Sequence, residues 1–197
     1  MSKFVSSFKK GPKEQKFQGG NRNSTLYETG FISKKLGHMI SVDMDGTVAD
    51  ISARRLLALK SGPDGSPAFF NTLLDGALYH MDEPIIASRD FLQTYVSGNH
   101  GRVVYLSGRR QGSEKYSRDW LKVHGFPTGE IIHRRMGERS LNFKANWLRR
   151  FKSENEFVDA HFGDRLEDDG GAAETAGVSF VHIVDNRWPS FSDWSPM

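Results

Sequence analysis

The segment from Ser41 to Asp50 reads SVDMDGTVAD and places Asp43 and Asp45 one residue apart, where a short apolar run ends. Side chains at i and i+2 of a strand share one face, and Gly46 gives the backbone freedom to turn directly afterwards. If the chain bends into a loop here, both carboxylates can approach a single ligand. Such a pair suits nucleophilic and general acid–base chemistry.

Other polar residues stand at the ends of later apolar runs or open the next helix: Ser107, Lys144 and Asp164. In an open parallel sheet the carboxyl ends of the strands form the ligand crevice, so we expect these side chains to converge with the first two acids. Three carboxylates placed together repel one another unless a divalent cation such as Mg²⁺ lies between them. Lys144 and Ser107, with the backbone amides of the Gly46 and Gly108 loops, are suited to hold an anion.

A metal ion and an anion cradle beside a carboxylate favour phosphoryl transfer, in which positioning and charge neutralisation lower most of the barrier. One carboxylate can attack phosphorus to form an aspartyl-phosphate, and its neighbour can protonate the departing oxygen. The sequence therefore predicts a magnesium-dependent phosphoryl-transfer site.

Short apolar runs alternate with helical stretches from residue 38 onward, which predicts a parallel sheet with crossover helices and hence an α/β fold. The expected strands are residues 38–42, 102–106, 130–134, 157–164 and 177–185. The expected helices lie within residues 49–60, within 83–100, from about 113, and over 142–151.

The chain has 197 residues and no cysteine, so it can bury a core without disulfides, and thiol catalysis is excluded. It has no apolar run long enough to span a bilayer and no apolar core of a secretory signal. We expect a soluble, cytoplasmic protein that does not bind membranes.

Positive charge is concentrated at the N-terminus. Residues 1–37 hold eight lysines and arginines against two glutamates, a net +6, which leaves −3 on the rest of a chain whose total is +3. Residues 1–30 have neither a helical nor a strand period and are interpreted as a flexible basic tail. The tail is either a solubilising terminus or a non-specific tether for nucleic acid.

The sequence DMDGTVAD resembles the DxDGT signature of the haloacid dehalogenase (HAD) superfamily. Ser107, Lys144 and GDRLEDD resemble the second, third and fourth motifs of that superfamily, in the same order. The resemblance extends from about residue 38 to the end of the chain. It implies a Rossmann-like phosphatase domain over residues 38–197, with a small or minimal cap within residues 50–100.

The resemblance also implies a role for each motif residue. Asp43 would be the nucleophile, Asp45 the general acid and base, and Thr47 a support for the loop. The implied metal ligands are Asp43, Asp45 (through its backbone carbonyl), Asp164 and Asp168. The implied phosphate-binding residues are Ser107, Gly108, Lys144 and Thr47. Asp169 lies beside Asp168, so the motif leaves open which of the two supports the site.

Within the superfamily, VVYLSGRR, YSRDWLKVHGFP, HRRMGERSLNFKANWL and HFGDR look most similar to the 3′-phosphatase domain of polynucleotide kinase-phosphatases, which act in nucleic-acid repair. No GxxxxGK[ST] loop is present, so the resemblance is to the phosphatase part alone. Four arginines would suit a polyanionic substrate if they lined the mouth of the crevice. They are Arg109, Arg110, Arg134 and Arg135.

Three functions stay open on the sequence alone. The first is a Mg²⁺-dependent phosphatase of nucleic-acid 3′ ends, which a short cap segment and an open site favour. The second is a 5′- or 3′-nucleotidase or small-metabolite phosphatase, with PAFFNTLLD as a lid whose aromatic rings stack on a base or belong to the core. The third is a non-catalytic nucleic-acid-binding protein. The oligomeric state and a preference for RNA or DNA are not predicted.

Overall fold

A five-stranded parallel sheet forms the centre of the computed structural model, which describes residues 37–154 and 157–194. The tail predicted over residues 1–30 lies outside the described residues. The sheet order is β5-β4-β1-β6-β7, with the first strand of the sequence in the middle. These strands are β1 (His38–Val42), β4 (Arg102–Arg110), β5 (Glu130–Arg134), β6 (Phe157–Gly163) and β7 (Phe180–His182).

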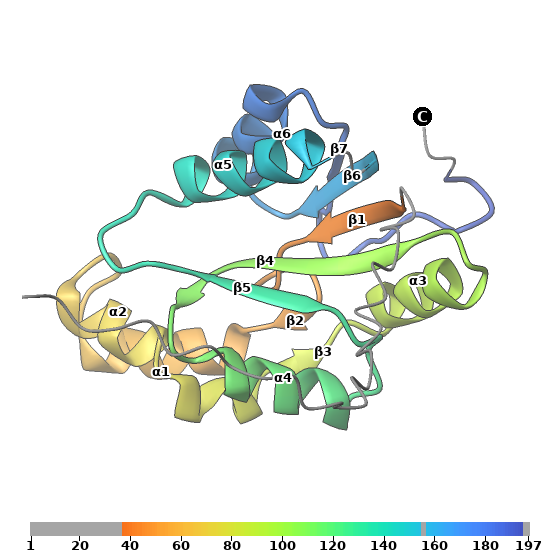
Figure 1. The fold of residues 1–197 in the computed structure, drawn as a ribbon. Helices are drawn as coiled ribbons and strands as arrows, with labels where there is room; N and C mark the ends of the chain where they lie inside the picture. The colour runs from red at the N-terminus through yellow and green to blue at the C-terminus, as the bar shows by residue number, and fades with distance from the viewer. Residues whose placement is uncertain (1–36, 155–156, 195–197) are drawn as a thin grey trace, which may run out of the picture. The chain divides into compact units, whose positions relative to one another are not determined.

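Helices cover both faces of the sheet, as Figure 1 shows. One face carries α3 (Ile86–Ser97) and α4 (Glu114–Val123), and the other carries α5 (Ser140–Ser153) and α6 (Gly171–Ala176). Successive side chains of β1 enter different cores. Ile40 packs in the core with α3 and α4, and Met39 packs in the core with α5 and α6. The predicted α/β fold is therefore confirmed.

A helical insert separates β1 from α3. It contains β2 (Ala49–Asp50), α1 (Ser52–Ser61), α2 (Pro67–Leu73), the 3₁₀ helix η1 (Gly76–Met81) and β3 (Glu83–Pro84). The antiparallel pair β2–β3 closes the insert at its base. Ser66 caps α2 by accepting a hydrogen bond from the backbone N–H of Phe69, and Pro67 occupies the first helical turn, where its missing N–H is not needed.

The structure narrows the region in which a cap could lie. We predicted a cap or lid within residues 50–100, yet α3 packs on the sheet and contributes Phe91, Leu92 and Tyr95 to its core. The insert that stands apart from the sheet ends at β3, so it is about two thirds as long as the predicted region.

Some boundaries differ from the predicted ones. Strand β4 continues past Leu106 to Arg110, through Ser-Gly-Arg residues that are polar but mostly buried, with an irregular register between Ser107 and Arg110. The π-helical turn η2 (Leu166–Gly170) and α6 were not predicted, because glycine and acidic residues interrupt the apolar periodicity there. In the described part of the chain, no helix combines the length and the apolar character needed to cross a membrane.

His133 of β5 is buried beneath the start of α4. Its Nδ1 lies 3.0 Å from Ser113 Oγ and 3.1 Å from the carbonyl oxygen of Arg110. Its Nε2 is buried without a hydrogen-bond partner among the described residues. Burial, reinforced by the nearby charge of Arg109, lowers the pKa of His133 to about 4. The imidazole is therefore neutral in the folded protein at neutral pH.

This shift predicts a loss of stability in mild acid. Between about pH 6.5 and pH 4 the unfolded chain binds a proton at His133 that the folded chain does not, so the free energy of unfolding falls as the pH falls. The contribution of His133 should drop by roughly 2 kcal/mol between pH 7 and pH 5. Urea unfolding of the wild type and of His133→Asn at both pH values measures it. A difference between the two proteins that does not change with pH would contradict the prediction.

Candidate active site

Three carboxylates and one lysine meet at the carboxyl end of the sheet. Asp43 follows β1, Asp164 follows β6, and Asp169 comes from η2; each offers an oxygen, and these oxygens lie within 4.8 Å of one another. Lys144 of α5 places its Nζ 2.9 Å from Asp43 Oδ1 and donates a hydrogen bond to Asp169 Oδ1. Asp169 also accepts from the backbone N–H of Arg165 at 3.2 Å and lies 3.1 Å from His161 Nε2.

Two glycines make this convergence possible. Gly46 has a φ of +82°, and a Cβ at this position would lie 2.4 Å from Asp164 Oδ2. Gly163 permits a similar approach, because a Cβ there would lie 2.3 Å from Cγ of Asp169. A side chain at either position would displace one of the acids, so both glycines are required by space, and Gly46 is required by its backbone conformation as well.

Burial and charge shift the ionisation of the cluster. Burial, only partly offset by Lys144, raises the pKa of Asp43 well above its usual range, and the carboxylates of Asp169 and Asp164 raise it further. Burial and Asp169 likewise raise the pKa of Asp164 to about 6. The pKa of Asp169 is instead lowered, because the effects of Lys144 and His161 exceed that of its burial.

The donor set of the cluster fits a hard divalent cation. Asp43 Oδ1 and Asp164 Oδ1 are buried and accept no hydrogen bond from the described residues, although the first is ion-paired with Lys144. Three carboxylates face one lysine, so the cluster has an excess of negative charge when ionised. Carboxylate oxygens are the ligands that Mg²⁺ prefers, and a cation would offset both the charge and the missing donors.

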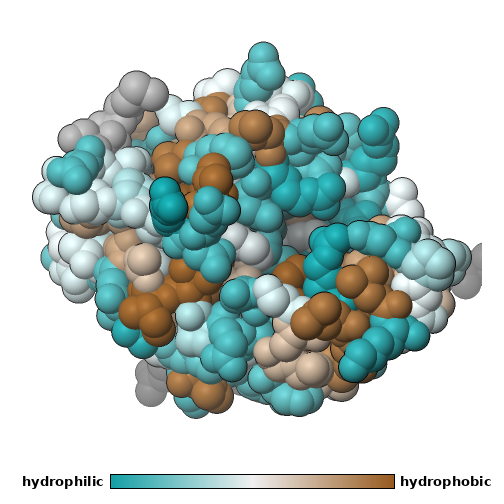
Figure 2. Space-filling view, turned by 180° about the vertical axis from the view of Figure 1, so that it is seen from behind, coloured by the Kyte–Doolittle hydropathy of each residue, from teal (hydrophilic) through white to brown (hydrophobic). Residues whose placement is uncertain are grey.

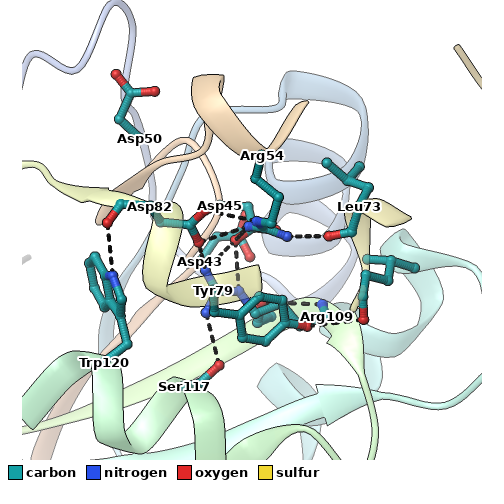
Figure 3. A network of polar contacts seen from close by, with 12 residues as sticks. Asp43, Asp45, Asp50, Arg54, Leu73, Tyr79, Asp82, Arg109, Ser117 and Trp120 are labelled. Atoms are coloured by element: carbon teal, nitrogen blue, oxygen red, sulfur yellow. Dashed lines mark hydrogen bonds and ion pairs between the residues drawn. The ribbon is translucent and has the colours of Figure 1, made fainter. Parts of the chain in front are cut away.

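Asp45 belongs to a second, separate charge network, shown in Figure 3. Its Oδ1 accepts from Arg54 Nη2 at 2.9 Å and from Arg109 Nε at 2.7 Å. Asp82 accepts from the same two arginines, at 2.8 and 2.9 Å from Arg54 and 2.7 Å from Arg109. Two buried arginines are thus paired with two carboxylates.

Further contacts fix the two guanidinium groups. The ring of Tyr79 lies 4.7 Å from Cζ of Arg54 and 4.0 Å from Cζ of Arg109, within cation–π range. Arg109 also donates to Ser117 Oγ of α4 at 2.9 Å, and Arg54 donates to the carbonyl oxygen of Leu73. The network therefore joins the insert, β4 and α4 to the loop that carries Asp45 (Figure 3).

The network shifts the pKa of Asp45 in the opposite direction from the pKa of Asp43. Burial raises the pKa of Asp45, but Arg109 and Arg54 together outweigh burial, so the pKa lies below its usual range. One oxygen of Asp45 is held by the arginines, and the side chain is still 21% exposed. Its second oxygen is therefore available to a ligand.

Both networks border one cavity of about 580 Å³. The bottom is formed by acids of the two networks and by Lys144, and the insert forms one wall with apolar and charged side chains. The wall residues are Ile51, Ser52, Arg55, Asp64, Phe69, Phe70, Leu73 and Leu74. In Figure 2 the surface is hollowed beside the insert, and hydrophobic atoms lie among hydrophilic ones around the hollow.

The structure brings together most, but not all, of the residues predicted for the site. Asp43, Asp45, Gly108, Lys144 and Asp164 line the cavity. Ser107 and Thr47 are fully buried and do not line it. Ser107 Oγ accepts from the backbone N–H of Arg109 at 3.3 Å, and Thr47 Oγ1 is buried without a partner in the described structure. A role for these two hydroxyls in phosphate binding stays a prediction.

The four arginines predicted to bind substrate are placed differently from one another. Arg134 lines the cavity, whereas Arg110 and Arg135 line other surface depressions. Arg109 is completely buried, and its guanidinium is occupied by Asp45, Asp82 and Ser117, so the predicted place at the crevice mouth is wrong. The sequence could not indicate that the negative partners of Arg109 lie inside the protein.

The two candidate acids of the fourth motif lie in different environments. Asp168 is partly exposed and forms an ion pair with Arg165 at 3.1 Å, away from the acidic cluster. Asp169 is fully buried within it. The metal-ligand role implied for Asp168 therefore fits Asp169 instead.

Arg54 and Asp82 are the main site residues that sequence reasoning missed. The one signal for Arg54 is its position four residues before Ala58 on the buried face of α1, where a charged residue requires a partner. Asp82 follows η1 in a segment with no motif, so no pattern in the sequence indicates it.

Comparisons by sequence find no relative: no protein-family model matches the chain, and no curated protein shows significant similarity. Solved structures do resemble it. A chain of the Pnkp1/Rnl/Hen1 RNA repair complex has a TM-score of 0.57 at 15% identity, over 83% of this chain and 47% of that chain. The class C acid phosphatase from Bacillus anthracis has a TM-score of 0.55 at 20% identity, over 76% of this chain and 67% of that chain.

A haloacid dehalogenase-like hydrolase from Bacteroides fragilis, described as putative, has a TM-score of 0.52 at 16% identity, over 79% of this chain and 92% of that chain. The chain spans about half the length of the similar chain in the repair complex. These likenesses, with the five-stranded parallel sheet, show that the chain has the HAD-like fold. The fold that the motif resemblance implies is thereby confirmed.

The different positions of Asp169 and Asp168 predict different effects on metal binding. Asp169→Asn should weaken Mg²⁺ binding by at least about tenfold, because it removes a buried charge from the cluster. Asp168→Asn, which changes an acid outside the cluster, should change the affinity by less than about twofold. Isothermal titration calorimetry of both variants measures this without substrate. Equal losses in the two variants, or no Mg²⁺ binding by the wild type, would refute the assignment.

Proposed function

We propose that the chain is a Mg²⁺-dependent phosphomonoesterase that acts through an aspartyl-phosphate on Asp43 and removes 3′-phosphates from nucleic-acid ends. The observation that carries the proposal is the buried Asp43 carboxylate, which pairs with Lys144 at 2.9 Å, clusters with Asp164 and Asp169, and lines the cavity. An aspartate carboxylate that borders a ligand cavity can act as a nucleophile and form a covalent intermediate.

In the first step, an ionised oxygen of Asp43 attacks phosphorus, and the bond from phosphorus to the leaving oxygen breaks. Asp45 gives its proton to that oxygen. Arg54 and Arg109 hold one carboxylate oxygen of Asp45 and leave the other for this transfer. The arginines lower the pKa of free Asp45, and the negative charge of a bound phosphate ester would raise it again.

In the second step, water attacks phosphorus of the aspartyl-phosphate while Asp45 accepts the proton of the water, which releases inorganic phosphate and restores Asp43. Lys144 would balance negative charge on the phosphoryl group. Asp43, Asp164 and Asp169 would hold Mg²⁺, whose charge would keep Asp43 ionised despite its burial and offset that of the phosphate.

The cavity wall supports a leaving group that has an aromatic, apolar face. Both phenylalanines of PAFFNTLLD line the cavity, but Phe69 is buried, whereas Phe70 is 45% exposed. Arg55, Arg134 and Arg165 also line it and would attract additional phosphates. An exposed ring near basic residues suits a nucleotide more than a small sugar phosphate.

A nucleic-acid substrate is further supported by the structural likeness to a chain of an RNA repair complex. The basic residues 1–37, most of which lie outside the described part of the chain, would add non-specific attraction for nucleic acid. The insert is short, so a chain end could enter the cavity. A mononucleotide is the alternative substrate on the same scaffold.

A substrate panel tests the proposed function. The wild type should release phosphate from 3′-phosphorylated RNA or DNA oligonucleotides with Mg²⁺ and not with a chelator, and more efficiently than from nucleoside 3′- or 5′-monophosphates. Asp43→Asn should lower turnover by at least about a thousandfold, while the melting temperature stays close to that of the wild type because Lys144 keeps its ion pair with Asp169.

Each contrary outcome has a distinct meaning. Equal efficiency on mononucleotides would favour a nucleotidase, and preference for a simple alkyl phosphate would favour a metabolite phosphatase. No phosphate release from any ester would favour a non-catalytic binding protein. Appreciable turnover by Asp43→Asn would contradict the assignment of the nucleophile.

Phe70 should contribute to binding of the leaving group. Because stacking of a base on an aromatic ring is worth about 1–3 kcal/mol, Phe70→Ala should raise KM for a nucleoside 3′-monophosphate by about tenfold. KM for glycerol phosphate should not change, and Tyr116→Ala, at an equally exposed ring outside the cavity, should change neither. Steady-state kinetics of both variants measure these KM values. Equal increases in KM for the two substrates in Phe70→Ala would contradict stacking.

A further inference from the structure

The segment that follows β7 packs an aromatic cluster against the sheet. Rings of Trp188, Phe191 and Trp194 surround Phe91 of α3, with centroid distances of 5.2, 5.2 and 5.4 Å. Trp188 also stacks on Phe162 of β6, at 4.9 Å and nearly parallel, with an interplanar angle of 5°. The C-terminal segment therefore reaches the strand that leads to Asp164.

Trp188 also reaches the loop of the nucleophile. Its indole Nε1 donates a hydrogen bond of 2.9 Å to the backbone carbonyl oxygen of Thr47. Thr47 is fully buried in the turn of residues 43–49, which is closed by hydrogen bonds from the N–H groups of Val48 and Ala49 to the carbonyl of Met44, each 3.0 Å long. Trp188 is thus one of several external supports of this turn, since Ile85 N–H also donates to the carbonyl of Val48 at 2.9 Å and two arginines donate to Asp45.

The same indole therefore contacts both segments that carry site acids. Phe162 is the residue under the indole ring, and its carbonyl accepts from the backbone N–H of Asp43 at 2.9 Å. Asp164 follows Phe162 by two residues, and Asp45 precedes Thr47 by two. The indole, stacked on one segment and hydrogen-bonded to the other, adds to the direct backbone hydrogen bond that joins the two segments.

We propose that Trp188 is a positioning residue that holds the turn of residues 43–49, and hence Asp45, against the end of β6. This inference rests on the proposed function for its catalytic consequence, because Asp45 is the proposed proton donor. Displacement of the acid by a fraction of an ångström slows proton transfer to the leaving group. The rate therefore falls most for substrates whose leaving group requires that proton. An alkoxide leaving group needs the proton, and a nitrophenolate hardly does.

Trp188→Phe tests the proposal, since it removes the N–H donor and keeps an aromatic ring on Phe162. For this variant kcat/KM with a nucleoside 3′-monophosphate should fall about tenfold more than kcat/KM with 4-nitrophenyl phosphate. Trp194→Phe is the matched control, because Trp194 packs in the same cluster and makes no hydrogen bond to the turn in the described structure. In Trp194→Phe the ratio of kcat/KM for the two substrates should equal the ratio in the wild type.

Amide hydrogen exchange provides a readout that does not need activity. The N–H groups of Val48 and Ala49 should exchange about tenfold faster in Trp188→Phe than in the wild type, and at the wild-type rate in Trp194→Phe. Equal falls in kcat/KM for both substrates together with unchanged exchange would overturn the proposal and leave Trp188 as a packing residue. A wild type inactive on every phosphate ester would refute the proposed function, and the exchange rates would still decide the role of Trp188.

Discussion

The arrangement of the site depends on one constraint: buried carboxylates must be compensated by positive charge. Three of them lie at the carboxyl end of the sheet, and Lys144 contacts two directly. Removal of one partner from a buried ion pair typically costs about 3–5 kcal/mol, because the remaining charge stays buried without compensation. The fold therefore places α5 where the ammonium group of Lys144 meets Asp43 and Asp169, with 2% of the lysine side chain exposed.

The same constraint explains why the insert is tied to the sheet. Arg54 belongs to α1 and Arg109 to β4, yet both donate to Asp45 and Asp82. None of the four charged groups could be buried alone, so the insert, the strand and the acid loop must adopt their relative positions together. The position of the cavity wall, including the exposed Phe70, thus follows from the network that also orients Asp45.

The sequence predicted the fold well where it depends on local patterns. Apolar runs such as HMISV and RVVYL indicated strands of the sheet, and the acid motifs indicated which ends carry the site. The prediction failed where partners come from distant segments. Arg109 was placed at the surface because nothing near SGRR indicates Asp82, and Asp168 could not be distinguished from Asp169 because the choice depends on the π-helical turn that directs one acid inward.

The two networks meet at a segment of only three residues, and this proximity has a chemical consequence. Asp43 contacts Lys144, and Asp45 contacts two arginines, although one residue separates them. Burial dominates at the first acid and raises its pKa, whereas positive charge dominates at the second and lowers its pKa. A cation beside Asp43 and an anionic ester beside Asp45 would each reverse the shift of the nearer acid. Ligand binding would therefore exchange the ionisation preferences of the two acids, giving an ionised Asp43 and a protonated Asp45 in the same bound state, as the proposed mechanism requires.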